Sequence, residues 1–287
     1  MREGRGAVEK KPYSRVYLEI TNICNRACSF CHGTSREPRR MSCEDFERAA
    51  RALVPMTDYL YFHLMGEPTT HPELTELIKT AKGLGFKCAV TTNGTLLKDK
   101  GDALIGSGVY KVNISVHSFE GGEGREKLKY LSEIADFADK ASERGVLVVL
   151  RLWNTERGEG ANEGVVDFFK ERLRGEWKWG ARGARIRHKL HLEYGERFDW
   201  PDMGAEDGGE RVFCYGLCDH FGVLCDGTVV PCCLDSDGRL ALGNIFSEPI
   251  EKILNSERAL AISEGFKQHT AKEELCRKCG YARRFKV

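Results

Sequence analysis

Apolar and polar positions along the chain follow strand-like and helix-like patterns in turn. Residues 16–20 and 59–64 are short and largely apolar, as expected of buried strands in a parallel sheet. Residues 72–84 instead place apolar side chains at helical spacing and end before Gly85, a common helix terminator. Further strands are expected at 87–92, 109–116, 146–153 and 186–194, and further helices at 42–53, 96–105, 124–144 and 165–173.

About six β–α repeats over about 180 residues predict an α/β fold with a parallel sheet and right-handed crossovers. Periodicity leaves two architectures open, an open Rossmann-type sheet and an incomplete barrel. In both, ligands bind at the carboxyl ends of the strands. Polar or reactive residues follow the expected strands at 24–31, 66–68, 91–94, 115–117, 151–154 and 193–197. We therefore expect one site, built from these strand ends.

A change in composition divides the chain. Residues 195–209 are rich in Gly, Asp and Pro and read as a linker. A β-hairpin over 221–230, with a turn at Asp226-Gly227, and a helix near 248–256 are expected after it. We predict a flexible tail over 1–13, a first domain over 14–200 and a small cysteine-rich domain over 210–287.

Charge and hydropathy exclude several classes of partner. The formal net charge is +1 with 30% charged residues, so no overall field favours nucleic acid. A basic stretch at 177–189 leaves an RNA-binding hypothesis open, although a solvated face on the last βα unit is the commoner explanation of such a stretch. There is no signal peptide and no apolar run of about 18 residues, so we expect a cytoplasmic protein without a membrane partner.

The twelve cysteines fall mainly into two groups, at 24–31 and 214–279. In a long chain without export signals, such groups indicate metal binding rather than disulfides. Cys24, Cys28 and Cys31 have the spacing C-x₃-C-x₂-C. Three thiolates on a cubane [4Fe–4S] cluster leave the fourth iron open for chemistry. Half of a zinc site is the alternative for these three, and Cys276-x-x-Cys279 by itself is also typical of zinc.

The cysteine spacing, with Phe30 directly before the third cysteine, resembles the signature of the radical S-adenosylmethionine (SAM) superfamily. Gly66-Glu67-Pro68 and the strand ending at Ser115 resemble its SAM-binding motifs, although Met65 stands where that family usually has another glycine. The resemblance covers residues 14–195 and implies a partial (β/α)6 TIM-like barrel. It also implies a [4Fe–4S] cluster held by the three cysteines and completed by SAM.

The resemblance assigns roles to the strand-end residues. Glu67, within the Gly66 motif, would hold the SAM ammonium through a charge-assisted hydrogen bond. Ser115 and Arg151 would bind the ribose and carboxylate, although Arg151 is equally explained as a structural cation. Phe30 would contact the adenine, and Asn93 is a further polar contact. In the family, a reduced flavodoxin or ferredoxin supplies an electron that cleaves SAM to a 5′-deoxyadenosyl radical, which abstracts a hydrogen atom from substrate.

The C-terminal cysteines resemble the SPASM/Twitch class of auxiliary iron–sulfur domains. A single-cluster Twitch domain implies an auxiliary [4Fe–4S] cluster, and its four ligands would be Cys214, Cys232, Cys276 and Cys279. The surplus cysteines leave a different ligand set or a second auxiliary cluster open; they are Cys218, Cys225 and Cys233. Four protein ligands leave such a cluster no substrate site, which favours electron transfer.

Three enzymatic functions remain. The first is a radical SAM oxidoreductase that dehydrogenates a small molecule and passes an electron to the auxiliary cluster. Glu193 and Arg197 are candidates for helping the substrate lose a proton, as are His188, His191 and Glu196, and the sequence singles out none of them. The second is a peptide maturase, which the short N-terminal tail disfavours because maturases usually carry an N-terminal recognition domain. The third is an RNA-modifying radical SAM enzyme, which rests only on the basic stretch. The substrate itself is not predicted.

Overall fold

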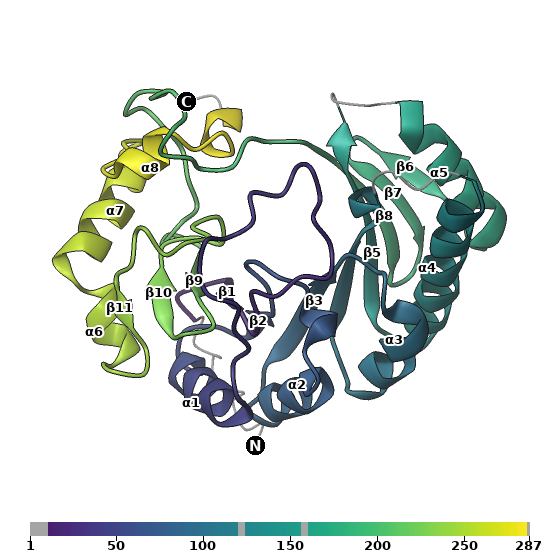
Figure 1. Cartoon of the computed structure of the whole chain (residues 1–287), viewed down its shortest axis with the longest axis horizontal. Coiled ribbons are helices and arrows are strands. Elements are labelled where there is room, and N and C mark those ends of the chain that lie inside the picture. Colours follow the sequence, from purple (N-terminus) through teal and green to yellow (C-terminus); the bar gives the residue numbers. More distant parts are fainter. Residues whose placement is uncertain (1–10, 120–123, 156–159, 286–287) are drawn as a thin grey trace, which may run out of the picture.

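In a computed structural model that describes residues 11–119, 124–155 and 160–285, an eleven-stranded sheet curves around the centre of the molecule (Figure 1). Its strand order is β11-β10-β9-β1-β2-β3-β4-β5-β8-β7-β6. The parallel part comprises β1 (Arg15–Leu18), β2 (Tyr59–Tyr61), β3 (Lys87–Thr92), β4 (Lys111–Ser115), β5 (Leu147–Thr155) and β8 (Leu190–Glu196). The predicted partial barrel is confirmed.

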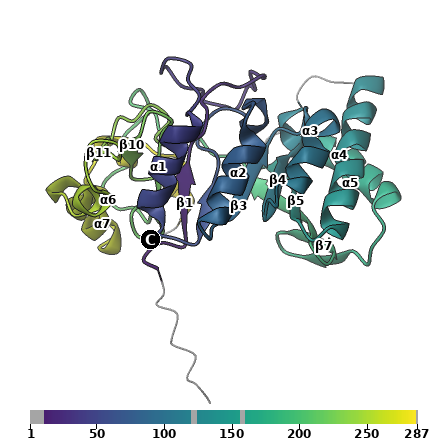
Figure 2. The same ribbon diagram turned by 90° about the horizontal axis from the view of Figure 1, so that it is seen from below.

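Helices cover the outside of this curved sheet (Figure 2). They are α1 (Cys43–Leu53), α2 (Leu74–Gly83), α3 (Leu97–Gly106), α4 (Arg125–Glu143) and α5 (Gly160–Arg172). The first begins where expected, because the Ser42 hydroxyl accepts a hydrogen bond from the Asp45 backbone and caps the helix. Its buried face, Phe46, Ala49 and Leu53, packs on the even-numbered side chains of β1, such as Leu18.

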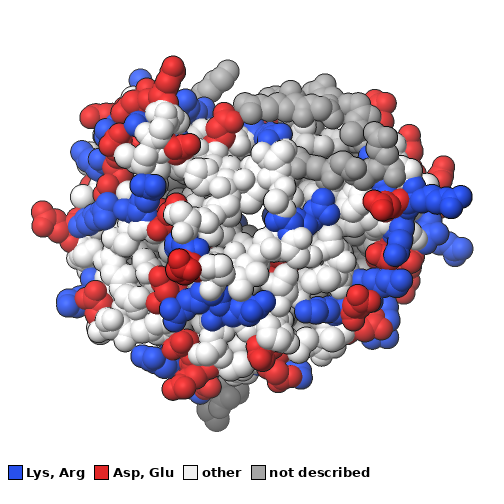
Figure 3. Space-filling view, viewed as in Figure 1, with Lys and Arg blue, Asp and Glu red and all other residues white. Residues whose placement is uncertain are grey.

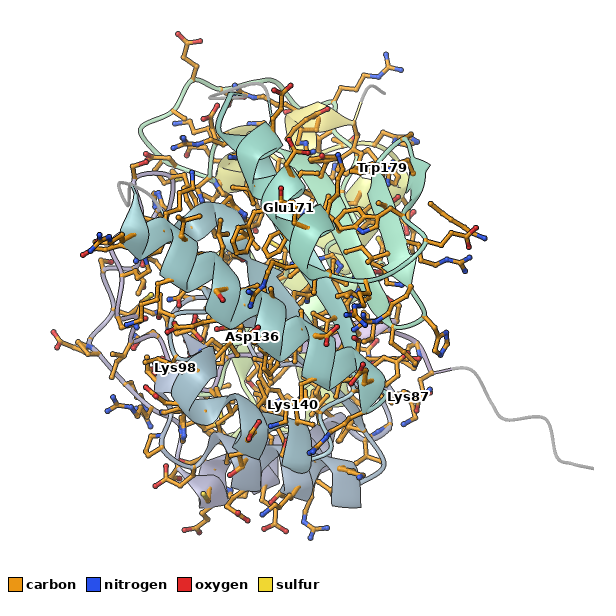
Figure 4. The ribbon with its side chains drawn as sticks, turned by 90° about the vertical axis from the view of Figure 1, so that its right-hand side faces the viewer. Lys87, Lys98, Asp136, Lys140, Glu171 and Trp179 are labelled. Carbon is orange, nitrogen blue, oxygen red and sulfur yellow. The ribbon has the colours of Figure 1, made fainter. Side chains whose placement is uncertain are left out.

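Charged residues cover the outer face of the helices. Figure 4 shows Lys98, Asp136 and Lys140 on α3 and α4 pointing away from the sheet. Lys140 pairs with Asp102 at 2.5 Å, an exposed contact of the kind that contributes little to stability. The outer face of the helices is therefore exposed to solvent. The inner face of the sheet is the one available to form a site.

The expected strand at 186–194 is wrong in its extent. The structure divides it into β7 (Gly183–Arg187) and β8, which are antiparallel and joined by a tight turn. Lys189 takes a positive φ of 65° in that turn, a conformation that a strand excludes. A further strand, β6 (Lys178–Gly180), pairs with β7. The basic stretch thus forms an antiparallel edge that leads into the sixth parallel strand.

The cysteine-rich part is joined to the barrel through the sheet. The predicted hairpin is confirmed as β9 (His220–Val223) and β10 (Thr228–Val230), with β11 (Gly243–Asn244) beyond it. β9 pairs in parallel with β1, so Leu18 lies opposite Val223. Three helices follow, α6 (Ile250–Leu254), α7 (Glu257–Lys267) and α8 (Glu274–Arg277), of which the sequence predicted only the first. The hydrophobic pattern of one strand could not show that its partner lies about 200 residues away.

The N-terminal segment is described from residue 11 onward, so most of the predicted tail lies outside the described residues. Lys11 pairs with Asp58 at 2.8 Å, and the Tyr13 ring packs edge-on against Phe221 at 4.8 Å. Residues 11–13 therefore contact the barrel. Within the described ranges, no helix has both the length and the apolar character needed to cross a bilayer.

Leu18 tests the joint between β1, β2 and β9. Its side chain is fully buried, so Leu18→Ala should lower the free energy of unfolding by about 2–5 kcal/mol through lost burial and a residual cavity. Leu128→Ala on α4 is the matched control, because that side chain is 53% exposed and its removal should change stability by no more than about 0.5 kcal/mol. Urea unfolding under anaerobic conditions measures both. Equal losses would contradict this packing.

Candidate active site

The loop between β1 and α1, drawn in dark purple near the centre of Figure 1, carries the first three cysteines. Its base is closed by the Asn22 side chain, which donates to the Glu37 carbonyl at 2.8 Å and accepts from the Arg39 backbone at 2.6 Å. This closure lets the intervening residues project over the carboxyl ends of the strands.

One cavity of about 1440 Å³ lies beneath and beside this loop. The predicted strand-end residues all line it, namely Phe30, Gly66, Glu67, Asn93, Ser115, Arg151, Glu193 and Arg197. Both sets of predicted cluster cysteines line it too: Cys24, Cys28, Cys31, Cys214, Cys232, Cys276 and Cys279. The structure therefore gathers into one space the residues that sequence reasoning singled out from six strand ends and two domains.

Glu67 is buried at the end of the β2 loop, with 2% of its surface exposed. One carboxylate oxygen accepts from the Thr69 backbone at 2.9 Å and from the Thr69 hydroxyl at 2.7 Å. The other accepts from the Asn93 backbone at 2.6 Å. Burial raises the pKa of Glu67, and these hydrogen bonds oppose that rise. The carboxylate thus braces two strand ends, with Thr92 as a further donor, and its negative charge suits it to attract a ligand cation.

Gly66 explains why this motif needs a glycine. Its φ is +73°, and a Cβ at this position would lie 2.4 Å from the Thr21 carbonyl oxygen. The backbone of the loop therefore packs directly against the start of the cysteine loop. Met65 does not disturb this contact, because the close approach falls on the second glycine of the family motif.

Asn93 connects the β3 end to the cysteine loop. Its side-chain amide donates to Asn25 at 2.9 Å, and its oxygen accepts from the backbone and hydroxyl of Thr95. Asn93 thereby holds the loop next to Cys24, whose thiol pKa is raised by burial. Its role is at least partly structural, which the sequence did not indicate.

Arg151 lies in the barrel interior. Its guanidinium stacks over Trp153 at 4.4 Å from the ring centre, and its Nε lies 3.8 Å from the Glu193 carboxylate. That Nε is buried and has no hydrogen-bond partner within the described residues. Burial lowers the pKa of Arg151. An arginine with an unused donor facing a cavity is better suited to bind a ligand than to serve as a structural cation.

The segment predicted as a linker closes over the cysteine loop. The Trp200 indole donates to the Phe30 carbonyl at 3.1 Å, and the Arg197 guanidinium lies 5.5 Å from the centre of the Phe30 ring. Sequence reasoning missed Trp200, although aromatic residues at 198 and 200 in an otherwise polar linker could have signalled it. Phe30 is therefore held on its backbone side, and its ring faces His117 at 5.1 Å.

The auxiliary cysteines gather against one another. Burial raises the thiol pKa of Cys214 to about 12. Burial also raises the thiol pKa of Cys232, and four neighbouring thiols add to that rise, those of Cys214, Cys233, Cys276 and Cys279. Thiols crowded in this way are a donor set for a metal centre, since metal cations replace their protons. Among the described residues, no three such side chains close on a single metal ion. A [4Fe–4S] cluster has four irons at separate corners, so its cysteine ligands lie farther apart than the ligands of a single metal ion.

The structure separates the surplus cysteines. Cys233 adjoins the auxiliary group, where burial raises its thiol pKa to about 11 and Tyr17 hydrogen bonds to it. Cys225 instead contacts Arg36 at 3.7 Å, and Cys218 contacts the Ser263 carbonyl at 3.7 Å. Neither Cys218 nor Cys225 lines the cavity. The gathered set is thus the four predicted ligands with Cys233 beside them.

Glu19 joins the two halves of the site and was missed by sequence reasoning. Glu19 directly follows β1. Its side chain is fully buried and pairs with Arg36 at 2.8 Å. It also accepts from the backbones of Met65, at 3.1 Å, and Cys225, at 3.2 Å. One carboxylate therefore holds the cysteine loop, the Glu67 loop and the auxiliary unit together.

The contacts after the cysteine loop strengthen this connection. The Thr34 hydroxyl donates to Asp237 at 2.7 Å, and the same carboxylate accepts from the Ser35 backbone at 2.9 Å. Arg36 donates from Nε to the Ser236 carbonyl at 2.8 Å. The loop that carries the first cysteine set is thus hydrogen-bonded to the loop that follows Cys232.

Two family models match the chain, one over the barrel and one over the cysteine-rich part that follows it. The radical SAM superfamily matches residues 18–154, and the SPASM iron–sulfur cluster-binding domain matches residues 214–280. The chain belongs to the radical SAM superfamily. Its two matched domains are those that use SAM and iron–sulfur clusters as cofactors, with an auxiliary cluster in the SPASM domain.

Solved structures of other radical SAM proteins share the fold. BtrN in complex with AdoMet and 2-DOIA superposes with a TM-score of 0.58 at 18% identity, over 94% of both chains. SuiB of Streptococcus suis bound to S-adenosylmethionine gives 0.63 at 16% identity, over 94% of this chain and 71% of that one. Identities this low establish the fold only.

Relatives found by sequence match a shorter part of this radical SAM chain than the solved structures do. A probable GTP 3′,8-cyclase of Methanothermobacter marburgensis is 31% identical over 109 residues, 37% of this chain and 36% of that protein. A Saccharolobus islandicus protein of the same name is 30% identical over 130 residues, 44% and 41%. The chain therefore spans less than half the length of these relatives.

Glu19→Gln tests the connection between the two units. Removing the charge leaves the partly buried Arg36 without its counterion, so the free energy of unfolding should fall by about 3 kcal/mol. Glu47→Gln is the control, because Glu47 pairs with Arg51 on the exposed face of α1 and should cost at most about 0.5 kcal/mol. Urea unfolding of the iron-loaded protein measures the difference. Similar losses in the two variants would count against the role of Glu19.

Proposed function

We propose that this radical SAM enzyme dehydrogenates a small molecule, abstracting a hydrogen atom by way of SAM and passing an electron to the auxiliary cluster. The observation that carries the proposal is the single cavity lined by both cysteine sets. A volume of about 1440 Å³ exceeds that of a typical pocket for one small ligand, about 300–1,000 Å³, and so suits several groups together.

The chain's own residues fit the cofactors. Cys24, Cys28 and Cys31 would hold the first cluster, and Glu67 would hold the ammonium of SAM. When bound and reduced, this pair supplies a 5′-deoxyadenosyl radical. The Trp200 contact to the cysteine loop would limit the access of water to it. Ser115 and Asn93 line the same cavity and would complete the polar contacts.

The auxiliary set would act in oxidation. Four thiols at Cys214, Cys232, Cys276 and Cys279 leave a cluster no coordination site for substrate, which favours an electron-accepting role. Loss of two electrons by the substrate also requires loss of a proton. Glu193 is the group we assign to that step, because its side chain is 39% exposed to the cavity and a carboxylate can accept a proton.

Arg197 is less suited to take a proton. A guanidinium remains charged at any physiological pH, so it cannot act as a base. Its position over Phe30 instead suits the holding of a ring or an anionic group near the cysteine loop. Of the two candidates from sequence, Glu193 is therefore the proposed base and Arg197 the proposed positioning residue.

The basic stretch at 177–189 supports RNA binding weakly. Lys178 pairs with Glu176 at 2.9 Å, and Arg187 pairs with Asp139 at 2.7 Å. Figure 3 shows acidic and basic side chains interspersed around the rim of the face it displays. A phosphate backbone is bound better by a continuous basic surface. The small-molecule proposal is therefore preferred.

Two cysteine variants test the division of labour. Cys28→Ala should remove about four of about eight Fe per chain and abolish SAM cleavage, because the first cluster is lost. Cys276→Ala should also lose about four Fe, yet retain SAM cleavage while substrate oxidation stops. Iron analysis and chromatographic detection of 5′-deoxyadenosine, with dithionite as reductant, measure these outcomes.

Cys43→Ala is the matched control, because Cys43 is exposed at the start of α1 and should leave both readouts unchanged. Zinc in place of iron in the wild-type protein would overturn the proposal. A Cys276→Ala variant that oxidises substrate fully would refute the electron-accepting role. Turnover with a peptide and none with small molecules would identify a maturase instead.

A further inference from the structure

The inner face of the barrel below the cysteine loop is polar. Strand register places Tyr17 beside Tyr61, Thr91 beside Asn113, and Arg151 beside Glu193. Because side chains alternate across a strand, one face of each strand turns inward and the other meets the helices. Inward positions of an ordinary barrel are filled by branched apolar residues, so a polar interior indicates a place for a ligand.

Several polar atoms in this interior lack a partner. His63 Nδ1, Asn113 Oδ1, Arg151 Nε and Trp153 Nε1 are buried without a hydrogen bond to any described residue. A buried polar group left unsatisfied is energetically costly, so four in one region require a compensating ligand or water. His63, Arg151 and Trp153 line the cavity itself. The side chains that carry three of these unsatisfied atoms thus border the space where substrate would lie.

The charges of this region do not balance. Arg15 is committed to Asp219 at 2.8 Å. The remaining two cations, Lys111 and Arg151, share one carboxylate, that of Glu193. The Lys111 ammonium makes no hydrogen bond to any of the described residues, and Glu193 is the acid that acts on it. At this depth of the barrel, one carboxylate therefore faces two cations.

The pKa values of two groups in this region are lowered by the neighbouring positive charges. Burial and the neighbouring Arg151 lower the pKa of the Lys111 ammonium. Burial, Arg151 and Lys111 lower the pKa of His63 to about 3, so its imidazole is neutral at physiological pH. A neutral imidazole can still donate or accept a hydrogen bond, and it adds no further positive charge.

We propose that Lys111 and Arg151 bind an anionic group of the substrate, a carboxylate or a phosphate, inside the barrel. This inference rests on the proposed function, because it assumes that the cavity holds a small-molecule substrate. An anion there satisfies the unused Arg151 donor and the Lys111 ammonium together. The neutral His63 imidazole and the Trp153 indole supply further hydrogen bonds around it.

The position of Lys111 separates this site from the SAM carboxylate. Lys111 begins β4 and Ser115 ends it, so about 13 Å of strand lies between their Cα atoms. The cysteines and Glu67 lie at the Ser115 end. The Cα of Arg151 lies opposite that of Ser115, but Tyr17 and Tyr61 influence the pKa of its guanidinium. This is expected if the Arg151 side chain extends down the barrel. A second anion, distinct from that of SAM, therefore suits the lower part.

Anion binding to the iron-loaded protein tests the inference. Isothermal titration calorimetry at low ionic strength, with saturating SAM, would use inorganic phosphate in one arm and succinate in the other. We expect at least one anion to bind, and Lys111→Met to weaken its binding about tenfold or more through loss of a charge-assisted contact. Glu193→Gln should tighten it severalfold, because the competing carboxylate charge is removed. The arm with the higher affinity distinguishes phosphate from carboxylate.

Lys79→Met is the control, since Lys79 lies exposed on α2 in a pair with Glu76 and should leave binding unchanged. Wild-type affinity in Lys111→Met, or no binding of either anion, would overturn the inference. Binding seen only without SAM would also overturn it, because the site would then be that of the SAM carboxylate. Formation of 5′-deoxyadenosine in the same samples reports on the proposed function separately. Absence of 5′-deoxyadenosine formation by the wild-type protein would refute the proposed function, whether or not the anions bind.

Discussion

The buried ion pair between Glu19 and Arg36 is the interaction on which the site depends. Its carboxylate accepts hydrogen bonds from three separate parts of the chain: the end of the cysteine loop, the loop after β2 and the turn after β9. Such a pair adds little net stability, because both charges lose their water. It does add specificity, since displacement of any one of the segments would leave a buried charge or backbone group unpaired.

This arrangement gives the two cysteine sets a common space. The first set lies on a loop that projects over the sheet, and the second comes from a unit whose strand β9 extends the same sheet beside β1. Because β1 lies between β2 and β9, one strand positions both sets. This proximity supports the proposed electron transfer from substrate to the auxiliary cluster, and the polar cavity suits the proposed charged substrate.

Much of the fold was predictable from the pattern of apolar residues. The strands at 87–92 and 146–153 and the helices at 42–53 and 124–144 were confirmed with small shifts of their ends. The strand at 186–194 was wrong, because alternation continues through a tight turn without a glycine or proline to mark it. Helix α7 was missed for a related reason, since Glu257–Lys267 follows α6 after a short break at Ser256.

The sequence by itself determined the chemistry. The spacing of Cys24, Cys28 and Cys31, the Glu67 motif and the later cysteines define a donor set, since ligand type and local spacing are properties of short segments. Only the tertiary structure decided which surplus cysteines join the auxiliary group, that Glu19 and Trp200 belong to the site, and that Lys111 and Arg151 share one carboxylate. These outcomes depend on strand register and on contacts between distant segments. A pattern of neighbouring residues does not record them, because the relevant free energy arises from burial and pairing across the fold.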